Sequence, residues 1–181
     1  NMKTGLVKGA LAAAIWSSST VFGTFASAEE VNATIVAGHP PVFRWVKHAS
    51  QTFIPAVNTA LEGSGTTITW SEQYGGSLAK VGDELEAVEE GLADIGLVSS
   101  LFDPGKLSVQ NVTYFTPFVS SDSTLVANWM DDLQHTNADM KASWAANGLE
   151  YLGGAIGIDD YLLMTNFPIN SIADLEGTTI G

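Results

Sequence analysis

Three segments of the sequence combine hydrogen-bonding side chains with small residues, and each follows a stretch patterned like a β-strand. They span residues 38–43, 73–77 and 99–102 and contain His39, Tyr74 and Ser99. Histidine and tyrosine offer a hydrogen bond on an apolar ring, while glycine lets a ligand approach the backbone closely. These residue types suit the binding of a small polar molecule, although glycine and serine also simply form turns.

The residues that could support catalysis or bind a metal are not arranged for either task in this sequence. There is no Cys, no G-x-S-x-G or H-E-x-x-H motif and no glycine-rich phosphate loop. The three histidines, His39, His48 and His135, lack ligand spacing on one helix. Asp159 and Asp160 are adjacent, so on a strand their carboxylates would point to opposite faces. We therefore expect no enzymatic activity, no metal and no cofactor.

Arg44, the one arginine of the chain, directly follows the first of the three segments. A guanidinium can bind a carboxylate through two parallel hydrogen bonds, so Arg44 is a candidate ligand contact. The alternative interpretation is an ordinary solvated surface residue.

Three short apolar or alternating stretches predict the strands that would position these segments. They are residues 31–36, 66–71 and 95–98, and the last has the continuous apolar character of a buried parallel strand. Helical patterns separate them, and the order β-α-β-α-β favours a parallel sheet with helices on both faces. Ligands of such sheets bind at the carboxyl ends of the strands, where the three segments lie.

Two helices are predicted between these strands from apolar residues at helical spacing. The first helix is defined by Val42, Val46, Ala49 and Phe53. Pro55 is expected to kink it or to end it near Ile54. The second helix has an apolar face of Val81, Leu85, Val88 and Leu92. Its carboxylates are expected to be solvated: Asp83, Glu84, Glu86, Glu89 and Glu90.

The rest of the chain predicts two further helices and several extended segments. The helices cover residues 123–133, with Val126, Trp129, Met130 and Leu133 on one side, and residues 138–148. Extended segments are expected at 149–155, 161–165 and 178–180, with a short connection over 168–176.

The composition limits the classes of protein to which the chain can belong. Its 181 residues include 20 acidic and 7 basic side chains, which give a formal net charge of −13. Nucleic-acid binding is not expected, because phosphate contacts need a basic surface. The 45% share of hydrophobic residues is too high for a disordered acidic segment, so we expect a folded domain.

The first 28 residues have the pattern of a cleaved secretory signal peptide. Lys3 and Lys8 precede an apolar stretch, and Ala26-Ser27-Ala28 matches a small-x-small cleavage site. Polar residues 17–20 interrupt the apolar stretch, which never reaches the ~20 residues of a membrane span. We therefore expect export to the periplasm.

Four stretches follow one another in the order G-G-S-L-A-K, E-L-E-A-V-E-E-G-L-A-D-I-G-L-V, T-P-F and N-F-P-I-N-S-I-A-D-L-E-G-T-T-I. With the export signal, they make residues 31–180 similar to the periplasmic solute-binding proteins of TRAP (tripartite ATP-independent periplasmic) transporters, of the dicarboxylate type. The resemblance implies an α/β, periplasmic-binding-protein-like (type II) lobe with a parallel-rich sheet and flanking helices. The lobe would cover 29–175, and 176–181 would be a hinge and the start of a second lobe, incomplete because the C-terminal half is missing.

In that family a hinged cleft closes over an organic acid and presents it to two membrane subunits. Two positions of this chain depart from the family pattern. Gly181 stands where the family usually has an arginine that binds the ligand carboxylate, and residues 161–165 lack a second arginine that is common there. Either Arg44, backbone amides and hydroxyls replace these groups, or the ligand is not a simple carboxylate.

The sequence thus predicts an extracytoplasmic receptor that captures a small organic acid or a related polar metabolite for the membrane subunits of a TRAP transporter. One alternative is a periplasmic sensor that passes its ligand to a signalling partner. Another is a secreted α/β enzyme whose catalytic residues lie in the missing half. The residues expected to contact the ligand are His39, Arg44, Tyr74, Gly75, Gly76, Ser99, Ser100, Phe102 and Tyr161.

Overall fold

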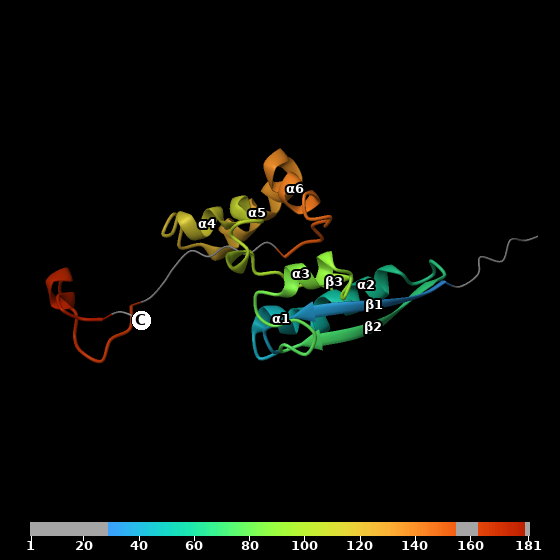
Figure 1. The fold of residues 1–181 in the computed structure, drawn as a ribbon, viewed down its shortest axis with the longest axis horizontal. Helices are drawn as coiled ribbons and strands as arrows, with labels where there is room; N and C mark the ends of the chain where they lie inside the picture. The colour runs from blue at the N-terminus through green and yellow to red at the C-terminus, as the bar shows by residue number, and fades with distance from the viewer. Residues whose placement is uncertain (1–28, 155–162, 180–181) are drawn as a thin grey trace, which may run out of the picture.

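Three parallel strands form one sheet: β1 (Glu29–Ala37), β2 (Thr66–Tyr74) and β3 (Ile95–Gly96). The strand order is β2-β1-β3 (Figure 1). β1 and β2 pair along their whole length, from Glu29 opposite Thr66 to Ala37 opposite Tyr74, whereas β3 adds only two residues. This computed structural model describes residues 29–154 and 163–179, so the expected signal peptide and Tyr161 lie outside the described residues.

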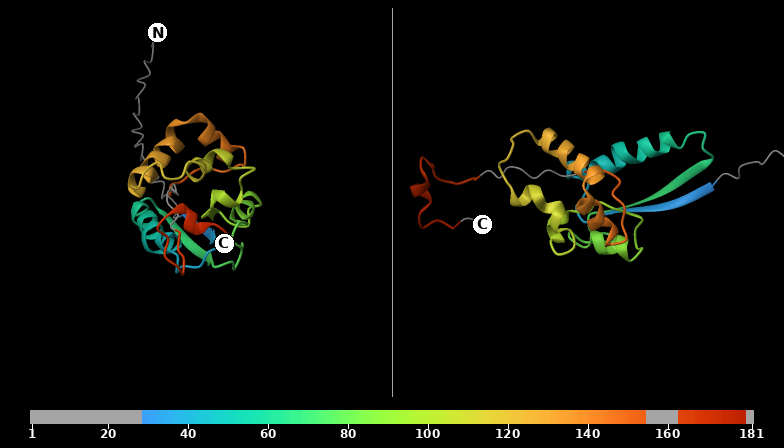
Figure 2. Two further views of the ribbon diagram at one scale, coloured as in Figure 1. Left: turned by 90° about the vertical axis from the view of Figure 1, so that its left-hand side faces the viewer. Right: turned by 90° about the horizontal axis from the view of Figure 1, so that it is seen from above.

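Helices cover both faces of the sheet, which confirms the predicted α/β class with parallel strands. Ile35 and Val36 are neighbours on β1, so their fully buried side chains point to opposite faces. On one face Ile35 packs with η1 (Ala49–Phe53) and α2 (Ile54–Ala60), which directly follow the helix α1 (Arg44–His48). On the other face Val36 packs with α3 (Glu84–Glu89). The right-hand view of Figure 2 shows the first group running along one side of the strands.

Of the two outcomes predicted at Pro55, an end of the helix near Ile54 is wrong, because the helical segment continues. Residues of η1 form a π-helical turn, in which the Ile54 N–H donates to the Ala49 carbonyl five residues back. Pro55 lacks an N–H and its ring displaces the carbonyl four residues earlier. Because the wider turn precedes Pro55 and places it in the first turn of α2, the helix continues to Ala60.

The acidic helix is shorter than expected, and one of its carboxylates is not solvated. α3 covers six residues, so Val81 and Leu92 lie outside it and are exposed, while Leu85 is fully buried. Glu84 is only 1% exposed. Its two carboxylate oxygens accept hydrogen bonds from the Gly38 N–H at 2.9 Å and the Gly82 N–H at 2.7 Å. These bonds compensate for the burial of the carboxylate, which a helical pattern alone does not reveal.

A second group of helices follows β3. It consists of the 3-10 turns η2 (Ser100–Phe102) and η3 (Ser108–Asn111) and the helices α4 (Val112–Phe115), α5 (Ser123–Thr136) and α6 (Ala138–Ala145). Buried Gln110 and Gln134 are hydrogen-bonded to each other, and their partners include Ser143 and Trp144 of α6. The helices predicted from 123 and 138 are confirmed, although Trp129 is exposed rather than packed with Val126 and Met130.

The C-terminal residues contain no strand in the part that the structure describes. The sequence predicts extended segments at 149–155, 161–165 and 178–180, but residues 149–154, 163–165 and 178–179 carry none. The predicted connection contains the 3-10 turn η4 (Ile172–Leu175), closed by a capping box between Ser171 and Asp174. Residues 163–179 lie apart from the other described elements in Figure 1 and in the right-hand view of Figure 2. The strand pairings of the described residues involve only β1, β2 and β3.

Among the described residues, no helix combines the length and the apolar character that crossing a bilayer requires.

Candidate functional site

The most suitable place for a ligand is the carboxyl end of β1 and β3. The chain leaves β1 toward β2 on one side and later returns to β3 on the other side, which makes this a topological switch point. At such a point the loops that follow the two strands diverge and leave a crevice. The segments that follow β1 and β3 contain His39 and Ser99 to Phe102, respectively.

The loops after β1 and β2 are in direct contact at this edge. The Gly75 N–H donates to the His39 carbonyl at 3.1 Å. Gly75 and Gly76 have φ values of +70° and +80°, a conformation that glycine adopts without steric cost. A side chain at Gly75 would also contact Pro40 at 3.6 Å. The structure therefore brings His39, Gly75 and Gly76 together.

The His39 ring lies among three aromatic side chains. Its centroid is 4.8 Å from Phe43, 5.1 Å from Trp45 and 6.5 Å from Phe102. We call these four residues the aromatic cluster. Phe43 and Phe102 are 45% and 51% exposed, so the cluster presents apolar ring surface to solvent.

The Nδ1 atom of His39 is buried and has no hydrogen-bond partner among the described residues. Buried polar atoms in native proteins are nearly always satisfied, because an unmade bond costs about 1–3 kcal/mol. A ligand group that bonds to Nδ1 would remove this cost, while the aromatic rings would cover its apolar part. The cluster is therefore a candidate contact for a small polar molecule, which would have to displace the groups that cover Nδ1.

Glu84 fixes the backbone on which this cluster is built. Through its bonds to Gly38 and Gly82, it ties the end of β1 to the turn before α3. Phe102 packs over that same turn, with its Cβ 3.3 Å from the position a side chain at Gly82 would occupy. His39 thus follows a segment that Glu84 binds directly, and Phe102 packs against the other segment that Glu84 binds.

Tyr74 points into the core rather than toward the aromatic cluster. Its ring packs with Ile35, Ala49 and Ile54 beneath η1. Its hydroxyl is buried and makes no hydrogen bond of good geometry with the described residues. Burial raises the pKa of Tyr74 above its usual value, and the charge of Glu72 raises it further, whereas nearby Ser50 partly opposes the shift.

Tyr74→Phe is expected to leave the free energy of unfolding within ~0.5 kcal/mol or to increase it, because it removes an unbonded buried hydroxyl and keeps the ring. Tyr74→Ala also removes the ring and is expected to lower that free energy by ~2 kcal/mol or more. Urea denaturation measures both values. A loss above ~1 kcal/mol in Tyr74→Phe would mean that the hydroxyl is bonded after all.

Ser100 has a structural partner. Its hydroxyl donates to the Asn111 side-chain oxygen at 2.7 Å, and the Asn111 amide donates back to the Ser100 carbonyl at 2.9 Å. This pair links η2 to η3. Ser99 precedes η2, and its carbonyl accepts a hydrogen bond from the Phe102 N–H at 3.1 Å.

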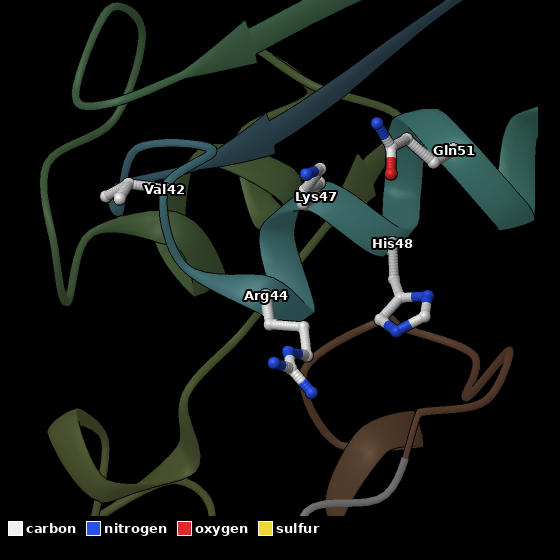
Figure 3. A pocket seen from close by; sticks show the side chains of 5 residues that line it. All are labelled: Val42, Arg44, Lys47, His48 and Gln51. Atoms are coloured by element: carbon white, nitrogen blue, oxygen red, sulfur yellow. The ribbon is translucent and has the colours of Figure 1, made fainter.

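Arg44 lines a pocket to which no residue of the aromatic cluster contributes. With Val42, Lys47, His48 and Gln51 it lines a pocket of about 330 Å³ on the outer side of α1 and η1 (Figure 3). Of the residues expected to contact a ligand, the structure therefore gathers His39, Gly75, Gly76 and Phe102 at the switch point. Ser99 and Ser100 lie on the adjacent turn.

Two members of the aromatic cluster, Phe43 and Trp45, are absent from the ligand contacts predicted from the sequence. Phe43 only ends the first predicted segment, and Trp45 only flanks the predicted helix. The sequence does contain a signal for the cluster. The aromatic residues Phe43, Trp45 and Phe102 all lie in or next to the segments that follow two predicted parallel strands. Among the described residues, no group of three His, Asp or Glu side chains is placed to hold a metal ion.

No protein-family model and no curated protein matches the chain.

Proposed function

We propose that this chain is an extracytoplasmic solute-binding receptor that captures a small organic acid or a related polar metabolite for a TRAP-type secondary transporter. In this proposal the described sheet and helices belong to a type II periplasmic-binding-protein-like lobe. The motif resemblance supports the family, and the parallel α/β sheet with its strand order β2-β1-β3 is compatible with such a lobe.

The unsatisfied Nδ1 of His39 is the observation that carries the proposal. It lies at the switch point of the sheet, between aromatic rings that are half exposed. A polar solute would bond to Nδ1 and to backbone groups of the adjacent loops, and the rings would exclude water around it.

Capture would operate by a shift between open and closed states. A solute that also contacts the opposing lobe binds the closed state more tightly, and it shifts the population by that difference in affinity. The formal net charge of −13 repels an anionic solute at long range. Salt screens this repulsion beyond ~10 Å, so the local donors decide whether the solute stays bound.

A thermal-shift screen of the full chain against small organic acids and related polar metabolites tests the proposal. A compound that binds only the folded state stabilises it, by ~2.7 kcal/mol at a concentration 100 times the Kd. His39→Ala is expected to weaken binding of the best compound about tenfold or more, because one buried hydrogen bond is lost.

His135→Ala provides the matched control, because His135 is exposed on α5 and outside the aromatic cluster. It should leave the affinity unchanged. A screen without any stabilising compound would argue against the receptor. Turnover of a bound compound would support a secreted enzyme instead.

A further inference from the structure

The outer face of α1 and η1 carries a row of hydrogen-bond donors. Arg44, Lys47 and His48 occur at positions i, i+3 and i+4 of α1, and Gln51 of η1 lines the same pocket. Figure 3 shows these side chains along the pocket that they line with Val42. We infer that this pocket binds a small oxyanion of the phosphate, sulfate or carboxylate type, separately from the solute at the aromatic cluster.

The distribution of charge along the chain supports this inference. The formal net charge is −13, yet residues 31–61 contain no Asp or Glu. Within residues 29–154 and 163–179, the salt bridges join Lys106 to Glu89 and His135 to Asp131, so Arg44 and Lys47 pair with no carboxylate there. Both cations are therefore available to an anion from solution.

The side chains of the pocket include the donor types that bind oxyanions. A guanidinium binds two oxygens of such a group in parallel, and an ammonium adds a strong point charge. The Oγ1 atom of Thr52 lies 3.0 Å from Nδ1 of His48, and this hydrogen bond orients the His48 ring. No carboxylate of the described residues lines the pocket. Glu72 accepts a hydrogen bond from Ser50, which is not a lining residue either.

Calorimetric titration of the full chain with inorganic phosphate tests the inference. We expect saturable binding, and we expect Arg44→Gln to lower the affinity about tenfold through the loss of the bidentate contact. Lys47→Gln is a second variant at an exposed lining position and is expected to weaken binding as well. Circular dichroism checks that both variants are folded.

Lys141→Gln is the charge-matched control, because it removes one positive charge from an exposed position of α6 that does not line the pocket. Its phosphate affinity should equal that of the unmodified chain. An equal loss of affinity in Lys141→Gln and Arg44→Gln would reduce the effect to general electrostatics and overturn the site. The absence of saturable binding at millimolar phosphate would overturn it too.

Discussion

Gly38→Ala is expected to lower the free energy of unfolding by ~3 kcal/mol or more, at the upper end of the cost of overpacking. A Cβ at this position would lie 2.3 Å from the Val81 nitrogen and 2.5 Å from the Lys80 carbonyl carbon. These are backbone atoms, so no side-chain rotation can relieve the clash. The end of β1 and the turn before α3 must move apart, and a domain with ~5–15 kcal/mol of stability loses a large part of it.

Urea denaturation followed by tryptophan fluorescence measures this loss. Gly105→Ala is the matched control, because Gly105 has an ordinary φ and a Cβ added there would meet no atom within 4 Å. It should change the free energy of unfolding by less than ~0.5 kcal/mol. If Gly38→Ala were as stable as the control, the close approach of residues 38 and 80–82 would be wrong.

Glu84→Gln is expected to lower the free energy of unfolding by ~1–3 kcal/mol. The amide keeps one oxygen acceptor but turns an NH₂ group toward the second of two backbone N–H donors, those of Gly38 and Gly82. One buried N–H is then left without an acceptor. Because the same bonds hold the end of β1, which leads into His39, and the Gly82 turn, against which Phe102 packs, solute affinity should fall together with stability.

Glu86→Gln makes the same chemical change two residues away, on an exposed position of α3. Its stability should stay within ~0.5 kcal/mol of the unmodified chain. Equal stabilities of the two variants in urea would show that the Glu84 carboxylate is not holding the loops.

The strands and the longer helices could be predicted because their signals are local. Alternation in residues 66–71 and the apolar run at 95–98 mark β2 and β3, and the helices starting at Ser123 and Ala138 follow from apolar spacing. Asp122 and Asn137 accept bonds from the first free N–H groups of these helices, which fixes where they begin.

The environment of Glu84 could not be predicted, since it depends on Gly38, 46 residues earlier in the chain. The same reason applies to the candidate site. His39 and Phe102 are far apart in sequence, and only the parallel packing of β1 and β3 brings them together. Pro55 is a different case. Proline is a clear local signal for the end of a helix, but here a π-helical turn precedes it and the helical segment continues.

Neighbouring residues of α1 belong to the aromatic cluster and to the proposed oxyanion pocket. The ring of Trp45 lies 5.1 Å from that of His39, while Arg44 lines the outer pocket. An oxyanion that displaces α1 would consequently act as a heterotropic effector of solute capture. Thermodynamic reciprocity then requires the solute to change the affinity for the oxyanion by the same factor.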